Sequence, residues 1–128
     1  MLTLDQMRDI AKTQNVIFYK HDCPFCAASD KLFTAMVEKG IVETYNKYYL
    51  HEDFTDELLT SLVKEFGWVG GEFQNNCTKP QVFVRGEYVG GNFEFYKSKW
   101  NKGLDESGKL EIDGVEKETP NLNNPMRF

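Results

Sequence analysis

Apolar residues recur every three or four positions in four stretches of the chain and form short uninterrupted runs in four others. The first pattern is typical of amphipathic helices and the second of buried strands. Together they predict the order helix, strand, helix, strand, helix, strand, strand, helix. The predicted helices lie near residues 3–11, 24–39, 55–66 and 92–100, and the predicted strands near 15–19, 42–50, 81–84 and 87–89.

Capping and turn residues support these boundaries. Thr3 and Gln6 have the spacing of a capping box, and Thr55 precedes two acidic residues at the expected start of another helix. Arg85-Gly86 separates two short apolar runs, which predicts a hairpin. Asn92 follows two glycines and is expected to cap the last helix.

A strand–helix–strand unit favours a parallel pair, whereas a hairpin is antiparallel. The pattern therefore predicts an α/β domain with a mixed four-stranded sheet and helices on both faces. This domain is expected to span residues 1–100, with an extra helix at its N-terminus. Residues 101–128 are rich in polar residues and are expected to be a C-terminal extension, either mobile or a second hairpin.

The composition excludes several classes of protein. The chain has 128 residues, which is enough for one domain, and its net charge is −5. A general nucleic-acid binder usually carries a basic surface, so nucleic acid is not expected as a partner. No apolar run approaches the ~18 residues of a membrane span, and the first residues do not resemble a signal peptide. We therefore expect a cytoplasmic protein without a membrane partner.

The three cysteines are the most informative residues. Cys23 and Cys26 form a Cys-x-x-Cys pair, whereas Cys77 stands alone. In an intracellular protein such a pair indicates redox chemistry or half of a metal site. The only histidines, His21 and His51, have no paired ligand spacing, so no metal site is expected.

The position of the pair favours redox chemistry. Cys23 lies where a strand gives way to a helix, and Pro24 suits the first helical position. Unpaired backbone N–H groups at the helix start, together with the nearby Lys20, should favour the thiolate of Cys23. We expect its pKa to lie between about 3.5 and 7.5. Cys23 is therefore the predicted nucleophile, and Cys26, one turn into the helix, the predicted resolving thiol.

Three separated motifs resemble the dithiol glutaredoxins of the thioredoxin-fold superfamily. They are Tyr19-Lys20-His21-Asp22-Cys23-Pro24-Phe25-Cys26, Thr78-Lys79-Pro80-Gln81-Val82-Phe83-Val84 and Tyr88-Val89-Gly90-Gly91. The likeness extends from about residue 15 to residue 100. It implies a thioredoxin-like fold and a glutathione-dependent thiol–disulfide oxidoreductase that uses Cys23 and Cys26. Glutathione would be a co-substrate, with no bound cofactor, and protein disulfides or protein–glutathione mixed disulfides would be the substrates of a monomer.

The resemblance also implies a cis peptide bond before Pro80 and a set of glutathione contacts. The backbone of Lys79 would pair with the cysteinyl part of glutathione, and Lys20 would face its glycyl carboxylate. Glu94 stands near the position where family members commonly have an Asp that holds the γ-glutamyl amino group. The full set of implied contacts is Lys20, Phe25, Lys79, Pro80, Gly91, Asn92 and Glu94.

Several alternatives remain open from the sequence. A thioredoxin-like reductase served by a flavoprotein reductase would use the same cysteine pair. A module that holds a cluster or metal between two protomers through Cys23 is another class, and a non-catalytic docking domain is a third. The ammonium of Lys79 could add positive potential near the sulfur or bind a glutathione carboxylate, or it could be a solvated surface group. The roles of Cys77 and of the 68–77 loop are also undecided.

Overall fold

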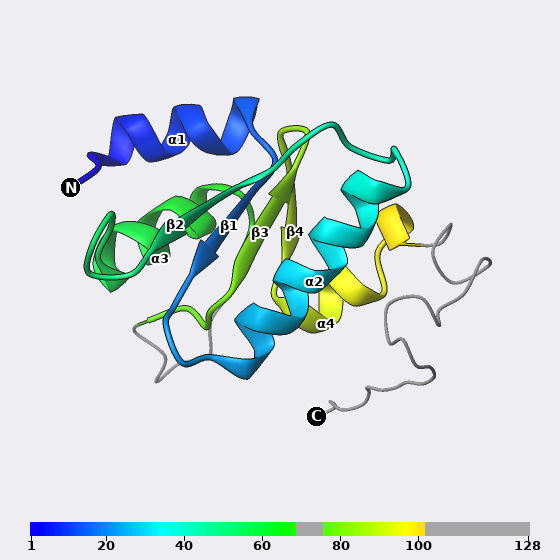
Figure 1. The fold of residues 1–128 in the computed structure, drawn as a ribbon. Helices are drawn as coiled ribbons and strands as arrows, with labels where there is room; N and C mark the ends of the chain where they lie inside the picture. Colours follow the sequence, from blue (N-terminus) through cyan, green and yellow to red (C-terminus); the bar gives the residue numbers. More distant parts are fainter. Residues whose placement is uncertain (69–75, 102–128) are drawn as a thin grey trace.

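The computed structural model describes residues 1–68 and 76–101, and it contains a four-stranded sheet with helices on both faces (Figure 1). The elements follow the predicted order, with one additional 3₁₀ turn at the end. They are α1 (Leu4–Thr13), β1 (Val16–Tyr19), α2 (Pro24–Glu38), β2 (Asn46–Tyr49), α3 (Asp56–Glu65), β3 (Gln81–Val84), β4 (Glu87–Gly90), α4 (Asn92–Tyr96) and η1 (Lys99–Asn101).

The sheet has the strand order β2-β1-β3-β4. β1 pairs in parallel with β2, so that Val16 faces Asn46, and it pairs antiparallel with β3. β3 and β4 form the antiparallel hairpin. The predicted mixed sheet and thioredoxin-like architecture are thus confirmed.

Side-chain caps start the first three helices. Thr3 and Gln6 form the predicted capping box, and the Thr55 hydroxyl accepts a hydrogen bond from the backbone N–H of Leu58 at 3.2 Å. At α2 the cap is the sulfur of Cys23, which accepts from the backbone N–H of Cys26 at 3.2 Å. The helix that carries the cysteine pair therefore begins at the candidate nucleophile.

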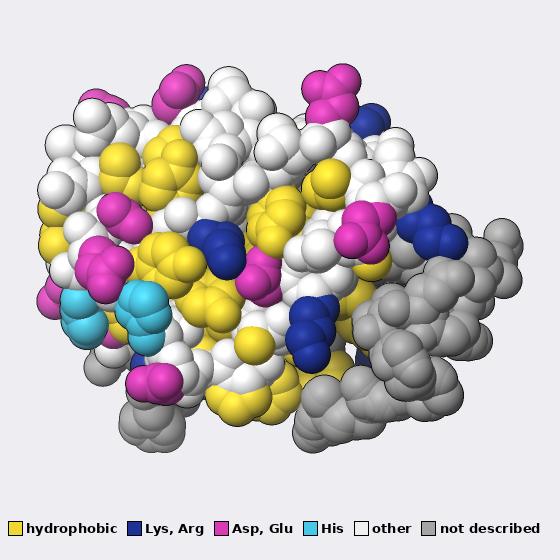
Figure 2. Space-filling view, in the orientation of Figure 1, with side chains coloured by type: hydrophobic (Ala, Val, Ile, Leu, Met, Phe, Trp, Pro, Cys, Tyr) yellow, Lys and Arg dark blue, Asp and Glu magenta, His cyan; other side chains and the backbone are white. Residues whose placement is uncertain are grey.

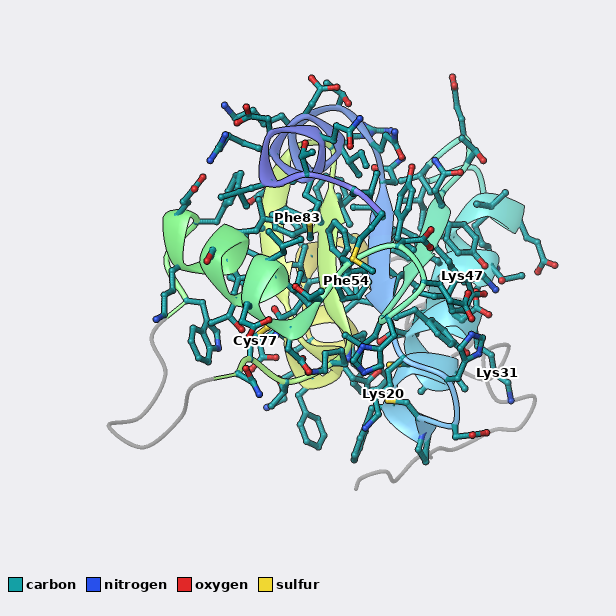
Figure 3. The ribbon with its side chains drawn as sticks, turned by 90° about the vertical axis from the view of Figure 1, so that its left-hand side faces the viewer. Lys20, Lys31, Lys47, Phe54, Cys77 and Phe83 are labelled. Carbon is teal, nitrogen blue, oxygen red and sulfur yellow. The ribbon has the colours of Figure 1, made fainter. Side chains whose placement is uncertain are left out.

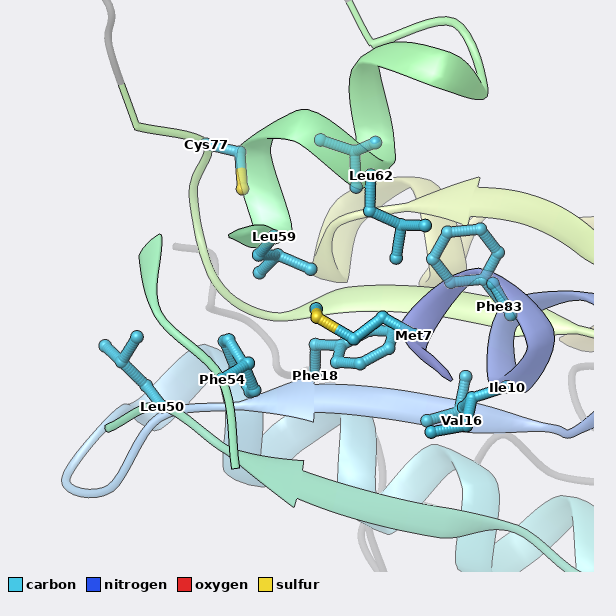
Figure 4. Close-up of a cluster of buried hydrophobic side chains, with 12 residues drawn as sticks. Met7, Ile10, Val16, Phe18, Leu50, Phe54, Leu59, Leu62, Cys77 and Phe83 are labelled. Carbon is cyan, nitrogen blue, oxygen red and sulfur yellow. The ribbon is translucent and has the colours of Figure 1, made fainter. Parts of the chain in front are cut away.

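The two faces of the sheet bury separate hydrophobic clusters. One cluster lies under α1 and α3, and Figure 4 shows Met7, Phe18, Phe54 and Phe83 converging in it. The other lies under α2 and α4 and includes Ile17, Leu32, Phe33, Val82 and Phe95. Alternate residues of β1 enter opposite clusters, as the two-residue period of a strand requires.

The hairpin turn confirms the prediction at Arg85-Gly86. Both residues have positive φ values, 53° and 80°, as in the type I′ turns that suit two-residue hairpins. The turn also lies against the end of α1, since a Cβ on Gly86 would come within 2.9 Å of the Lys12 carbonyl oxygen. Glycine at this position therefore permits both the turn and the close approach of the hairpin to α1.

The last helix differs from the prediction. Its N-cap is Gly91 rather than Asn92, which is the first helical residue. The prediction that Asn92 caps the helix is wrong because its side chain is buried against α2. Two aromatic side chains of this helix, Phe93 and Tyr96, are 47% and 42% exposed. Phe95 is the ring that enters the core.

Within residues 1–68 and 76–101, no helix is long and apolar enough to span a membrane. The predictions for most of the 68–77 loop and for nearly all of the 101–128 extension concern residues 69–75 and 102–128, which lie outside the described residues.

Phe54 provides a test of the packing under α1 and α3. Its ring is fully buried and meets Phe18 edge to face, with 5.4 Å between centroids. We expect Phe54→Ala to lower the free energy of unfolding by about 3–5 kcal/mol, because it removes a buried ring and leaves a cavity. Denaturant titration measures this loss. Phe25→Ala removes the same ring from a site where it is 40% exposed, and an equal loss in both variants would contradict the assigned core.

Candidate active site

Cys23 lies where the chain leaves β1 and enters α2. Its side chain is partly exposed, whereas Cys26, one turn later, is fully buried. Both cysteines are free thiols. Lys20 is exposed at the same end of the sheet as the segment that contains Cys77 (Figure 3). The structure therefore brings the predicted nucleophile to the surface and keeps its predicted partner beneath it.

Hydrogen bonds converge on the sulfur of Cys23. The Cys26 thiol and the backbone N–H groups of Cys26 and Phe25 donate to it, and Lys20 adds a positive charge nearby. The hydrogen bond from the Cys26 thiol has the largest effect on the pKa of Cys23. Burial acts in the opposite direction, but the hydrogen bonds and Lys20 together lower this pKa to about 6. A thiolate therefore predominates at neutral pH, and the thiolate is the form that attacks disulfides.

Cys26 responds in the opposite direction. Its hydrogen bond to Cys23 and its burial raise the pKa of Cys26 well above the usual range of a thiol. Cys26 thus remains protonated, and its thiol donates a hydrogen bond to the sulfur of Cys23. The pair consists of one thiolate and one thiol.

The segment before β3 forms the second side of the site. The backbone carbonyl oxygen of Lys79 lies 3.8 Å from the sulfur of Cys23. The Lys79–Pro80 peptide bond is cis, as the resemblance implied. Gly91 adjoins this segment, since a Cβ on it would come within 3.6 Å of the Pro80 carbonyl oxygen. Backbone of α2 and of the segment before β3 therefore lies beside the Cys23 sulfur, and Gly91 adjoins that segment.

The side chain of Lys79 is directed away from solvent. Its ammonium pairs with the carboxylate of Asp56 in the first turn of α3, and it donates to the backbone carbonyl of Cys77 at 2.9 Å. The side chain is only 11% exposed, so the interpretation of Lys79 as a solvated surface lysine is wrong.

Glu94 and Phe25 both contact the first turn of α4 or its cap. A carboxylate oxygen of Glu94 accepts a hydrogen bond from the backbone N–H of Gly91 at 2.9 Å, which caps the helix. Phe25 is partly exposed, and its ring centroid lies 6.3 Å from that of Phe93. One carboxylate oxygen of Glu94 is therefore used within the protein.

Two polar networks near the site were not predicted. The buried Gln81 side chain donates to the Thr78 carbonyl at 2.8 Å and accepts from the Tyr88 hydroxyl at 2.6 Å. The buried Ser29 hydroxyl donates to the Asn92 side chain at 2.7 Å, which links α2 to α4. Asn92 is among the predicted contact residues, but its bond to Ser29 was not expected.

The surface around the site carries charges of both signs. Figure 2 shows basic and acidic side chains interspersed with hydrophobic ones over one face of the molecule. His21 stacks on Tyr49, with 4.5 Å between ring centroids, and lies 3.1 Å from a carboxylate oxygen of Glu52. Among residues 1–68 and 76–101, no three histidine, cysteine, aspartate or glutamate side chains come together as metal ligands.

The chain is similar to solved structures of three glutaredoxins. Oxidised glutaredoxin 2 from Chlamydomonas reinhardtii superposes with a TM-score of 0.53 at 17% identity, covering 84% of this chain and 94% of that one. A dithiolic glutaredoxin from Trypanosoma brucei brucei gives 0.48 at 20% identity, covering 87% and 94%. Glutaredoxin 1 from Francisella tularensis gives 0.41 at 19% identity, covering 71% and 95%. The first of these matches shows that the chain has the same thioredoxin-like fold as that glutaredoxin.

No protein-family model matches the chain, and no curated protein sequence matches it.

The thiol of Cys26 can be tested as the main stabiliser of the Cys23 thiolate. A hydrogen bond to a charged group contributes about 1.5–3 kcal/mol, which corresponds to roughly 1–2 pH units. With Cys77 replaced by alanine, Cys23 should ionise with a midpoint near pH 6. Cys26→Ala should raise that midpoint by roughly 1–2 pH units, because the donor is lost.

The measurement is the ultraviolet absorbance of the thiolate against pH. Cys26→Ser keeps a hydroxyl donor at the same place and serves as the matched control, so its midpoint should lie between the other two. An alanine variant that titrates like the parent would show that the helix start and Lys20 suffice.

Proposed function

We propose that this chain, which has the glutaredoxin fold, is a thiol–disulfide oxidoreductase that uses glutathione as its reductant. The observation that carries the proposal is the division of roles within the cysteine pair. Cys23 is partly exposed with a lowered pKa, and Cys26 is buried with a raised one. Structural cysteines have no need of such a difference, whereas an attacking thiol and a resolving thiol require it.

The reaction begins when the Cys23 thiolate attacks one sulfur of a substrate disulfide. A bond forms between Cys23 and that sulfur, the substrate disulfide breaks, and the departing thiolate takes a proton. Once Cys23 is in a mixed disulfide, its sulfur is no longer a thiolate that accepts a hydrogen bond from the Cys26 thiol. The pKa of Cys26 then falls, because the hydrogen bond to Cys23 was the interaction that raised this pKa most.

Cys26 next gives up its proton and attacks Cys23. The Cys23–Cys26 disulfide forms, and the substrate's second sulfur leaves as a thiol. Two electrons have then passed from the cysteine pair to the substrate. One glutathione reopens the internal disulfide by forming a mixed disulfide with Cys23, and a second releases glutathione disulfide, which returns the pair to its reduced state. Glutathione is thus a co-substrate, and no bound prosthetic group takes part.

Backbone around the thiolate supports glutathione as the reductant. The Lys79 main chain faces the sulfur and can pair with the cysteinyl part of an extended peptide. Gly91 lies against the Pro80 carbonyl oxygen, and the exposed Lys20 can attract a carboxylate. Phe25, Pro80, Asn92 and Glu94 complete the proposed contact set.

A second candidate is a thioredoxin-like reductase served by a flavoprotein reductase. One observation favours it, namely that a carboxylate oxygen of Glu94 already accepts the Gly91 N–H. A carboxylate used as a helix cap is less available to the γ-glutamyl amino group. The two candidates share their chemistry toward the substrate and differ only in what reduces the Cys23–Cys26 disulfide.

Turnover of hydroxyethyl disulfide tests the proposal. In the presence of glutathione and glutathione reductase, the wild-type chain should consume NADPH above the uncatalysed background. Cys23→Ser should return the rate to that background, because a serine hydroxyl is not ionised at neutral pH. Cys77→Ala, which removes the buried third thiol, should retain the activity and is the matched control.

Thioredoxin reductase replaces glutathione and its reductase in a parallel assay. Turnover there alone would favour the second candidate. Equal activity of the wild type and Cys23→Ser would refute both candidates.

A further inference from the structure

The segment Cys77–Lys79 is bound to α3 at two places. The backbone N–H of Cys77 donates to the Thr60 hydroxyl at 3.0 Å, and the Lys79 ammonium pairs with Asp56. The second contact also joins the ends of the segment, because the same ammonium donates to the Cys77 carbonyl at 2.9 Å. One side of the candidate site is thereby attached to the first two turns of a helix that carries none of the predicted site residues.

Lys79 contacts both Cys23 and α3. The Lys79 carbonyl oxygen is 3.8 Å from the sulfur of Cys23, and its own side chain extends in the other direction to α3. Burial makes the attachment costly to break, because an ammonium that is 11% exposed would lose its carboxylate partner without gaining full hydration.

We propose that Asp56 is a positioning residue, which through its ion pair with Lys79 holds the segment Cys77–Lys79 in place beside Cys23. The inference rests on the proposed function only where it predicts an effect of Asp56 on disulfide turnover. Its structural part stands on the contacts alone. It also assigns the Lys79 ammonium to the protein's own structure rather than to a carboxylate of the substrate.

Cys77 offers a direct measure of this attachment. Its side chain is 1% exposed and packs with residues of α3 in the cluster under α1 and α3 (Figure 4). Reagents can reach its sulfur only when the segment moves away from α3. In a Cys23→Ser/Cys26→Ser background, Cys77 is the sole thiol of the chain, so its alkylation rate reports that opening.

In this background, Asp56→Asn should increase the rate of Cys77 alkylation by iodoacetamide about tenfold. Lys79→Met should have a similar effect, and the double variant should alkylate no faster than either single one, because both remove the same interaction. Glu57→Gln is the matched control, since it removes another acidic residue from the first turn of α3. Its rate should remain that of the parent.

A denaturant titration of each variant separates local opening from global unfolding. An unchanged alkylation rate in Asp56→Asn overturns the proposal, as does an increase that Glu57→Gln reproduces. Rates that rise only in proportion to a loss of global stability overturn it as well.

Turnover gives the second measurement, in the chain with all three cysteines. Asp56→Asn and Lys79→Met should each raise KM for the disulfide substrate severalfold while kcat and the ionisation midpoint of Cys23 change little. A higher KM in Lys79→Met together with an unchanged KM in Asp56→Asn would overturn the proposal, because it would show that the Lys79 ammonium binds substrate. Absence of turnover in the wild type would refute the proposed function and leave the alkylation result to decide the inference.

Discussion

The hydrogen bonds that converge on the sulfur of Cys23 are the constraint on which the site depends. They exist because α2 begins at this residue, so that backbone N–H groups without helical partners point at the sulfur. Cys26 adds the largest contribution, and it can do so only because the helix places it one turn later. The thiolate of Cys23 is therefore stabilised because α2 begins at this residue.

Most of the fold could be predicted from the sequence because its signals are local. The capping box at Thr3, the cap at Thr55 and the hairpin at Arg85-Gly86 each depend on residues only a few positions apart. The last helix was predicted less well, since three aromatic residues occur within four positions there. Which of them enters the core depends on the distance to α2, and a repeat pattern does not contain that information.

The site divides in the same way. The roles of Cys23 and Cys26 followed from their spacing and from a predicted strand-to-helix junction. The partners that orient the remaining backbone are distant in sequence: Asp56 is 23 residues from Lys79, and Ser29 is 63 residues from Asn92. An acidic residue in a first helical turn is fully explained by the helix dipole, so nothing in the sequence singled out Asp56.

The bond between Ser29 and Asn92 has a consequence for how a ligand would be received. It joins the helix that begins at Cys23 to the helix that begins beside Gly91, and both side chains are buried. The beginnings of α2 and α4 are thus linked to each other before any ligand binds. The protein would therefore lose little conformational freedom when an extended peptide binds across the beginnings of α2 and α4. More of the free energy of the peptide's contacts would then be available as affinity.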